Sequence, residues 1–217
     1  MTQRKRDLLR NLITPHKRDL IQQVLEKRSD YITFAFEQFY HEHNIHAAMR
    51  SIEGFGFQTV HIIDNSKKNE IDLTITKGAD YWLTVHRYAY DQASPVRNTQ
   101  DCFAALKQAG YLVVGAAPES GVAISDLPID QKIALVFGNE RIGLSAYARE
   151  QLDATVTIPM YGFTESFNVS AAVTVAAYEM RKKLEESGID AGLTQEHKDA
   201  LEMEWLMRLV RGSEYIE

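Results

Sequence analysis

Short apolar runs alternate with amphipathic stretches along most of this 217-residue chain. The runs have the length of strands, and the stretches between them repeat apolar residues at helical spacing. We expect strands at residues 31–39, 59–63, 82–88, 111–116, 133–137 and 154–158, and helices at residues 44–54, 98–109, 145–152 and 168–186. Alternation of this kind predicts an α/β fold in which helices cover both faces of a parallel sheet.

Both ends of the chain carry helical patterns outside this alternation. Residues 8–25 indicate one or two amphipathic helices interrupted near Pro15, and residues 194–211 indicate a helix that follows a glycine-containing break. We therefore predict an N-terminal helical extension at residues 1–29, a central domain at residues 30–187 and a C-terminal helical extension at residues 188–217.

Cysteine content and hydropathy indicate where the protein works. The single Cys102 excludes an internal disulfide and suits a reducing compartment, and its place in an amphipathic helix indicates a packing role. No apolar run approaches membrane-spanning length, and the basic N-terminus is not followed by an apolar signal core. We therefore expect a cytoplasmic protein without a membrane partner.

Charge is distributed unevenly along the chain. The net charge of −6 argues against a general nucleic-acid binder, because phosphate neutralisation needs clustered Lys and Arg. Residues 1–30, however, hold eight Lys and Arg against four Asp and Glu, so this end is basic and the remainder acidic. A basic arm of this kind can contact RNA, and a solvated helix face explains it equally well.

Three segments place polar residues directly after a predicted strand, which is where open α/β sheets bind ligands. The first contains Asn44 and Arg50 and opens a short helix. The second runs from the strand at 133–137 into a loop that is bracketed by glycines and contains Gly138 and Glu140. Both segments are candidates for one site at the edge of the sheet.

The third segment begins with Ile-Pro-Met at residues 158–160 and ends in an alanine-rich helix. A glycine turn between them delivers Ser166 and Asn168 to the start of that helix. A helix N-terminus offers free N–H groups and a partial positive charge, which favour an anionic or hydrogen-bond-accepting ligand. The same two residues also fit a helix cap without further function, so both interpretations stay open.

Common nucleotide-binding and metal-binding motifs do not account for these segments. The spacing from Gly138 to Gly143 is that of a phosphate-binding loop, but Leu144 stands where the motif needs Lys, and Glu140 would repel phosphates. No Gly-x-Gly-x-x-Gly follows a predicted strand, which disfavours a dinucleotide-binding dehydrogenase. We also expect no metal, because the histidine cluster lacks a convincing further ligand. That cluster consists of His41, His43 and His46.

In their order and context, the three segments resemble the three motifs of the SpoU branch of the SPOUT RNA methyltransferases. The likeness is greatest to the TrmH type, the tRNA guanosine-18 ribose 2′-O-methyltransferases, and it covers about residues 30 to 185. It implies a parallel-sheet SPOUT fold with a C-terminal trefoil knot that involves residues from about 111 through the helix after Asn168. It also implies a homodimer packed partly through the Ala and Val surface of that helix, in which motif one of one subunit completes the site of the other.

The resemblance implies S-adenosylmethionine as the cofactor, held bent mainly by backbone groups and apolar side chains. The residues expected near it are Ala116, Gly138, Ile158 and Phe167. A glycine permits close backbone approach, and the proline after Ile158 fixes the loop.

The resemblance also implies a catalytic set. Its members are Arg50, Asn44, Glu140, Ser166 and Asn168. The family's equivalent of Arg50 is held essential and has been proposed to take part in deprotonation, but an arginine with a pKa above about 12 is a poor free base. We expect Arg50 to clamp the phosphate beside the target ribose, with that phosphate or Arg50 in a perturbed state receiving the proton.

The other members have supporting roles in this interpretation. Glu140 is expected to orient Arg50 or the substrate, and Asn44 to act at the helix opening, where capping is an equally good explanation. Ser166 and Asn168 are expected to position donors and acceptors between substrate and cofactor. Neither has a base beside it in the sequence, so a covalent serine mechanism is not supported.

The predicted activity is methyl transfer from S-adenosylmethionine to a ribose 2′-hydroxyl of RNA, with guanosine 18 in the tRNA D-loop as the first candidate. Residues 139–142 and 161–165 depart from common TrmH versions close to where the substrate would bind. A ribosomal-RNA or anticodon-loop ribose methyltransferase therefore stays open as the alternative enzyme. A non-catalytic RNA-binding member of the fold is the alternative from another class.

Overall fold

The computed structural model describes residues 3–64, 78 and 81–216. The chain divides into two compact units, one formed by residues 31–190 and the other by residues 1–30 together with 191–217. The three candidate segments all belong to the larger unit.

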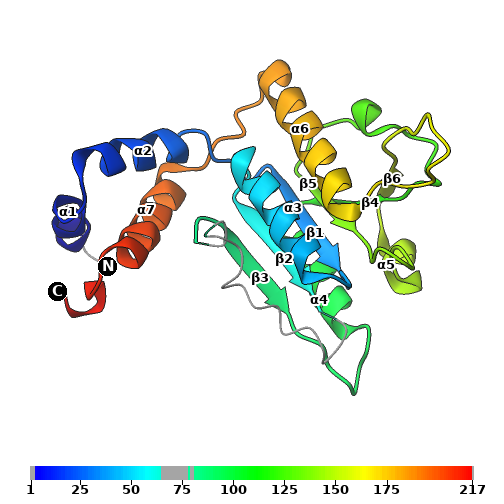
Figure 1. Cartoon of the computed structure of the whole chain (residues 1–217), viewed down its shortest axis with the longest axis horizontal. Coiled ribbons are helices and arrows are strands. Elements are labelled where there is room, and N and C mark those ends of the chain that lie inside the picture. The colour runs from blue at the N-terminus through cyan, green and yellow to red at the C-terminus, as the bar shows by residue number, and fades with distance from the viewer. Residues whose placement is uncertain (1–2, 65–77, 79–80, 217) are drawn as a thin grey trace. The chain divides into compact units, whose positions relative to one another are not determined.

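The larger unit contains a six-stranded sheet in the order β3-β2-β1-β5-β4-β6 (Figure 1). The strands are β1 (Ile32–Glu37), β2 (Thr59–Ile63), β3 (Thr84–Tyr88), β4 (Leu112–Ala116), β5 (Ile133–Phe137) and β6 (Ala154–Val156). Every neighbouring pair is parallel, which confirms the predicted α/β sheet. The chain order changes direction between the adjacent strands β1 and β5, and open α/β sheets bind ligands beyond the carboxyl ends of their strands near such a point.

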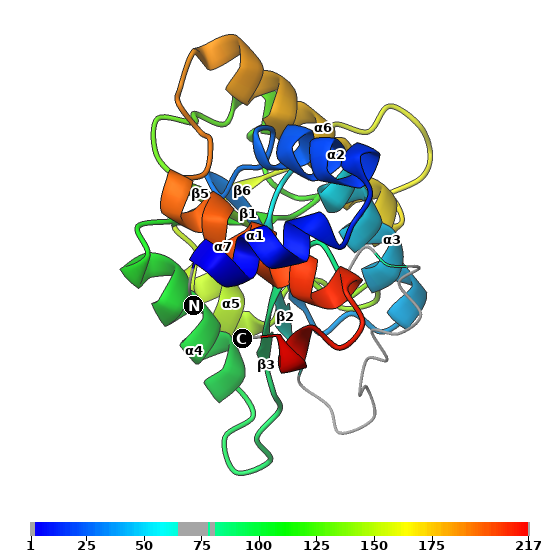
Figure 2. The ribbon, with the colours of Figure 1, turned by 90° about the vertical axis from the view of Figure 1, so that its left-hand side faces the viewer.

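Within the described part of the larger unit, four helices cover this sheet, two on each face. They are α3 (Glu42–Gly54), α4 (Arg97–Gln108), α5 (Ala146–Gln151) and α6 (Val169–Ser187), with a short 3₁₀ turn η2 at Ile124–Asp126. Figures 1 and 2 show α3 and α6 on one face and α4 and α5 on the other. Among the residues that the structure describes, no helix is long and apolar enough to cross a membrane.

The three central strands are mainly apolar because both of their faces are buried. Every residue of β1, β2 and β5 is buried, as expected for parallel strands covered by helices on both faces. Cys102 of α4 is also fully buried in this core, and burial raises the pKa of its thiol to about 12. Its packing role is thereby confirmed.

Helices α3 and α6 pack closely against each other. The hydroxyl oxygens of Ser51 and Thr174 lie 2.7 Å apart across the contact. The small residues Val173, Ala176 and Ala177 of α6 are fully buried. We expected a second subunit to pack partly against the Ala and Val surface of this helix, and these three residues are not available for that contact because they are buried within the chain.

Several element boundaries differ from the sequence predictions. Strand β1 ends two residues early because Gln38 adopts a left-handed backbone with φ of 57°. Helix α3 begins at Glu42 with His41 at its N-cap, so the interpretation of Asn44 as the cap is wrong. Strand β6 stops at Val156, after which Thr157 hydrogen-bonds to the segment before η2 instead.

The smaller unit consists of helices from both ends of the chain. Helices α1 (Gln3–Asn11) and α2 (Pro15–Leu25) both contact α7 (Gln195–Leu209), which is followed by the turn η3 (Ser213–Tyr215). The predicted interruption near Pro15 is confirmed, because Thr14 caps α2 by accepting a hydrogen bond from the amide of Lys17 at 3.3 Å. Figure 2 shows α1 and α2 beside α7.

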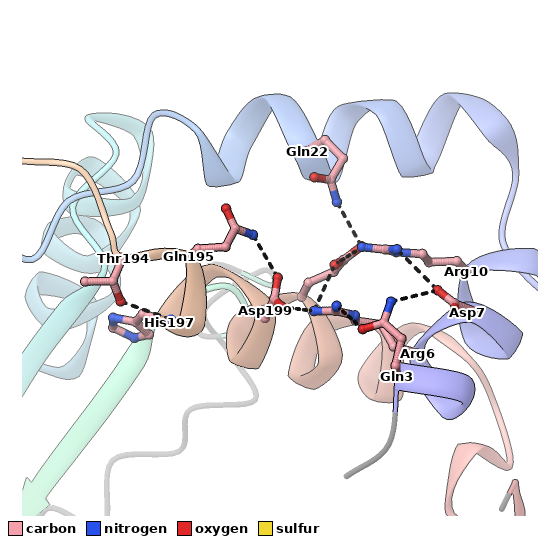
Figure 3. A network of polar contacts seen from close by, with 10 residues as sticks. Gln3, Arg6, Asp7, Arg10, Gln22, Thr194, Gln195, His197 and Asp199 are labelled. Atoms are coloured by element: carbon pink, nitrogen blue, oxygen red, sulfur yellow. Dashed lines mark hydrogen bonds and ion pairs between the residues drawn. The ribbon is translucent and has the colours of Figure 1, made fainter.

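Basic residues of the N-terminal segment are partly used inside this unit. The buried Glu202 of α7 accepts a hydrogen bond from Arg10 Nε at 2.6 Å and another from Gln22 Nε2 at 2.8 Å. Figure 3 labels the two donors, Arg10 and Gln22. Arg6 forms an ion pair with Asp199 at 2.7 Å. These arginines therefore join the terminal helices to one another, which reduces the charge that the predicted basic arm has free for RNA.

Candidate functional site

Asn44 of the first candidate segment hydrogen-bonds to the other two segments, and these two line one cavity at the carboxyl ends of the strands. Its volume is about 330 Å³, at the lower end of the range for small-molecule sites. All four predicted cofactor positions line it: Ala116, Gly138, Ile158 and Phe167. Ser166 and Glu140 line it as well. The sequence therefore located the walls of the cavity correctly.

Gly138 lies where the wall of the cavity is tightest. A Cβ at this position would overlap the backbone of Gly143 and Leu144. Two hydrogen bonds close the loop between the glycines. The Asn139 amide donates to the Gly143 carbonyl at 3.0 Å, and the Gly143 amide donates to the Asn139 carbonyl at 2.8 Å. Gly143 itself has a φ of 70°, which favours glycine. Both glycines are therefore required by the shape of this loop.

The loop is anchored from below by Glu37, the last residue of β1, which is only 1 % exposed. Its carboxylate accepts hydrogen bonds from the Ser145 amide at 2.9 Å, from the Ser145 hydroxyl at 2.7 Å and from the Thr99 hydroxyl at 3.0 Å. Ser145 in turn caps α5 by accepting from the Ala148 amide at 3.1 Å. Glu37 thus holds the end of the glycine loop and the start of α5 in place.

Glu37 was not predicted from the sequence, although the sequence carries a signal for it. A charged residue closes the otherwise apolar run of β1, and buried carboxylates occur almost only where hydrogen bonds compensate their burial. A second residue that was missed is Arg149, which lines the cavity and donates to the Leu144 carbonyl at 3.1 Å. It also forms an ion pair with Glu119, another lining residue.

Three of the predicted catalytic residues form a connected hydrogen-bond chain. Asn168 Nδ2 donates to Asn44 Oδ1 at 3.2 Å, and Asn44 Nδ2 donates to Glu140 Oε1 at 2.6 Å. At the other end, Asn168 Oδ1 accepts from the Ser170 amide at 2.9 Å, which makes Asn168 the N-cap of α6. The predicted capping role of Asn168 is confirmed, and the same side chain also joins α6 to α3.

Glu140 fixes the start of α3 as well as this chain. Its carboxylate accepts from the Tyr40 amide at 2.7 Å and from the His41 amide at 3.3 Å. Burial acts to raise the pKa of Glu140, but the hydrogen bonds from the Tyr40 amide and from Asn44 outweigh it and hold the pKa below its usual value. Glu140 is therefore ionised near neutral pH and can only accept hydrogen bonds.

The remaining two predicted residues are placed differently. Ser166 is exposed at the mouth of the cavity. Arg50 is exposed on α3, is not among the lining residues, and has no hydrogen bond or ion pair with any residue that the structure describes. The expected contact from Glu140 to Arg50 is therefore not made within one chain.

The histidine cluster is not arranged as a metal site. In the described part of the chain, no group of three or more His, Cys, Asp or Glu is placed to hold an ion.

Comparison with known proteins agrees with this geometry. The model of the SpoU rRNA methylase family matches residues 31–178. The tRNA (guanosine(18)-2′-O)-methyltransferase of Borreliella burgdorferi is 32% identical over 212 residues, which are 97% of this chain and 93% of that protein. The protein of the same name from Aquifex aeolicus is 30% identical over 172 residues, covering 78% of this chain and 77% of its own length.

Solved structures show the same relationship. The crystal structure of the A. aeolicus TrmH/SpoU tRNA modifying enzyme has a TM-score of 0.75 and 26% identity, and the match covers 90% of this chain and 98% of that one. The SpoU methyltransferase AviRb from Streptomyces viridochromogenes, in complex with the cofactor AdoMet, shares the fold with a TM-score of 0.61 and 24% identity, over 77% of this chain and 62% of that chain. Sequence motifs, sheet topology and these likenesses together place the chain in the SpoU rRNA methylase family.

Proposed function

We propose that this protein transfers the methyl group of S-adenosylmethionine to the ribose 2′-hydroxyl of guanosine 18 in tRNA. The observation that carries the proposal is the position of the Asn168–Asn44–Glu140 chain at the edge of the cavity that the cofactor-binding segments form. A relative named for this reaction matches 97% of the chain, and others of the same name match about four fifths of it. Such relatives act on tRNA, so the cytoplasm is the proposed site of action.

The residues present fit S-adenosylmethionine. The cavity combines an apolar wall, which includes Ile158 and Phe167, with the charged pair of Glu119 and Arg149. Gly138 leaves the backbone open to close approach by a ligand, because a side chain there would overlap the facing loop. The bound cofactor supplies an electrophilic methyl group on a sulfonium centre.

The chain's own residues orient the ribose and manage its proton. The amides of Asn44 and Asn168 are locked by their mutual hydrogen bond, so they present fixed groups and need no reorganisation during the reaction. The Ser166 hydroxyl at the cavity mouth has no hydrogen-bond partner among the described residues and can bond a ribose oxygen. Arg50 holds the phosphate beside the target ribose, and that phosphate, or Arg50 in a perturbed and deprotonated state, receives the proton of the 2′-hydroxyl.

We also propose that the working form is a homodimer in which Arg50 of one subunit completes the site of the other. Arg50 lies outside the lining of the cavity in its own chain and has no partner among the described residues. Two exposed side chains offer a surface for the second subunit: Tyr161, which follows the lining residue Met160, is 97 % exposed, and Tyr178 of α6 is 56 % exposed. A monomer in sedimentation at micromolar concentration would contradict this arrangement.

The proposed fold includes a C-terminal trefoil knot, formed by residues from about 111 through α6. The terminal segments 1–29 and 188–217 are proposed to flank the methyltransferase domain at 30–187. Likeness to the A. aeolicus enzyme over 90% of this chain supports both proposals.

Methyl transfer to an unmodified tRNA transcript tests the function directly. Purified protein is incubated with radiolabelled S-adenosylmethionine and either the wild-type transcript or a matched transcript with adenosine at position 18. Label that maps to guanosine 18 and vanishes with the adenosine transcript is expected. Label on ribosomal RNA or in the anticodon loop instead would replace the proposed substrate, and no transfer to any RNA despite cofactor binding would indicate a non-catalytic member.

A pair of substitutions tests the role of Arg50. Arg50→Lys keeps the charge but loses the planar fork that pairs with a phosphate at two points, so we expect a large loss of turnover. Arg97, an exposed arginine of α4 that pairs with Asp101 at 3.7 Å, offers Arg97→Lys as a matched control. Near-full activity of Arg50→Lys would exclude any role that needs a bidentate fork.

A further inference from the structure

Four exposed side chains form a continuous row beside the cavity. The Arg141 guanidinium lies 4.1 Å from the centre of the Tyr40 ring. The Tyr40 ring meets His41 edge to face with 4.7 Å between ring centres, and His41 stacks on His43 at 5.0 Å. All four residues are exposed, and we call them the aromatic row. Two of its members belong to the histidine cluster that the catalytic assignment leaves without a role.

The backbone holds the aromatic row in a fixed position. The Glu140 carboxylate binds the amides of Tyr40 and His41, and the next residue, Arg141, covers the ring of Tyr40. Consecutive residues of one loop therefore hold Tyr40 at both its backbone and its side chain. Glu140 and Arg141 also line the cavity, which places one end of the row at its mouth.

The charge at that end is not neutralised by any described residue. The guanidinium of Arg141 makes no hydrogen bond and no ion pair with any part of the chain that the structure describes. The nearest carboxylate in the sequence, Glu140, is already occupied by the amides of Tyr40 and His41 and by Asn44. A planar cation with free N–H groups, stacked on an aromatic ring, suits pairing with a phosphate.

The rings of the row offer a second kind of contact. Tyr40 is 49 % exposed and His41 and His43 are exposed, so ring surface remains for another flat group. Exposed aromatic rings next to a cation are the usual platform for single-stranded nucleic acid, because every base has a face that can stack. A nucleotide chain that lay along this row would have phosphate beside Arg141 and bases on the rings.

We propose that the aromatic row binds the RNA strand that flanks the methylated nucleotide, with Arg141 on a backbone phosphate and Tyr40 and His41 against a base. This inference rests on the proposed function, since it names how the RNA substrate is held at the same site. It explains why three features meet at one point of the surface: a loop arginine, a tyrosine between β1 and α3, and the N-cap histidine of α3.

The test compares RNA binding by Arg141→Gln and Tyr40→Leu with wild type and with Arg97→Gln, a matched exposed arginine outside the row. The probe is an unmodified tRNA transcript in filter-binding assays over a series of salt concentrations. We expect Arg141→Gln to weaken binding about tenfold and to lower the slope of log affinity against log salt by about one, as for loss of one phosphate contact. Tyr40→Leu should weaken binding about tenfold, and more than Tyr40→Phe, which keeps the ring.

Two parallel readouts separate this inference from the proposed function. Titration with S-adenosylmethionine reports whether the Glu140 loop kept its shape, and methyl transfer reports catalysis by the wild type. Methyl transfer by the wild type, with affinities and salt slopes of the row variants equal to those of Arg97→Gln, would overturn the aromatic row and leave the function standing. If the wild type binds tRNA without transferring methyl and the row variants bind it more weakly, the aromatic row is supported and the proposed function is overturned. If the wild type does not bind tRNA at all, both proposals are overturned.

Discussion

Replacing Glu140 with Gln reverses one end of the hydrogen-bond chain through Asn44 and Asn168. As a carboxylate, Glu140 can only accept, and so each amide in the chain is oriented toward it. A Gln at this position can still accept from the Tyr40 amide with its oxygen, but its NH₂ group then faces the NH₂ group of Asn44. Turning the Asn44 amide moves the conflict to Asn168, whose oxygen is held by the Ser170 amide.

The structure sets the size of this effect. One link of the chain is lost whichever amide turns, and a hydrogen bond to a charged group contributes roughly 1.5–3 kcal/mol. Glu140 is partly exposed, which reduces the value because water can replace a lost partner. We expect Glu140→Gln to lower the free energy of unfolding by about 1–2 kcal/mol and to lower turnover, measured by urea denaturation and methyl transfer.

A second substitution should restore the chain. Asn44→Asp alone places a carboxylate against Glu140 and should destabilise the protein, although its position in the first turn of α3 favours a negative charge. Combined with Glu140→Gln, the carboxylate introduced at position 44 accepts from both the side-chain amide introduced at position 140 and Asn168, so the charge has moved by one link. We expect the double variant to be more stable than the sum of the single changes by about 1–2 kcal/mol.

Two results would refute this reasoning. If Glu140→Gln were as stable as the wild type, the direction of the hydrogen bonds through Asn44 would make no contribution to stability. If the effects of the two substitutions on the free energy of unfolding added within about 0.5 kcal/mol, the two positions would not be coupled. The effect should also depend on pH. Because the folded-state pKa of Glu140 is lowered, its contribution is present above the unfolded-state pKa and is lost as pH falls through the folded-state pKa.

Three further changes test other parts of the site and fold. Glu37→Ala should lower the free energy of unfolding by about 3–5 kcal/mol in urea denaturation, because the Ser145 amide loses its acceptor. Glu37→Gln should lower it less, because the side-chain amide of Gln can still bond the hydroxyl groups that Glu37 binds. Equal losses for the two variants would contradict the hydrogen-bond argument. Gly138→Ala should weaken S-adenosylmethionine binding at least tenfold in calorimetry, because its Cβ displaces the facing backbone, and unchanged affinity would place the cofactor elsewhere. The hydrogen bond to Asp30 raises the pKa of His197. The stabilisation of the folded protein by this pair should therefore be complete below a pH of about 6.5, the unfolded-state pKa, and be lost as pH rises through the folded-state pKa. A His197→Gln variant whose unfolding has the same pH dependence as that of the wild type would exclude this contribution.

Sequence patterns predicted the sheet and its helices because apolar periodicity records burial on the two faces. The strands at 59–63 and 133–137 were predicted to the residue, since both are wholly buried runs with polar neighbours. The end of β1 was not, because it depends on the left-handed backbone of Gln38, and nothing in an apolar run marks that turn. Boundaries set by distant partners, such as the pairing of Thr157 with the segment near Ala123, were likewise missed.

The candidate site was likewise predictable in part. Motif residues could be named from the sequence, and the structure does bring Asn44, Glu140 and Asn168 together. Their shared direction of hydrogen bonding could not be predicted, because it depends on three segments that are far apart in the chain. The anchoring role of Glu37 was missed for the same reason, since its partners come from α4 and from the loop before α5.

The pairing of β1 with both β2 and β5 determines when the sheet can form during synthesis. The first three strands leave the ribosome early, but one edge of the fully buried β1 has no partner until β5 is synthesised. Asn168 follows later still, so the last link of the hydrogen-bond chain cannot form until α6 has emerged. A chain released before α6 would contain all six strands but no closed site, and premature termination would therefore yield an inert fragment rather than a partly active enzyme.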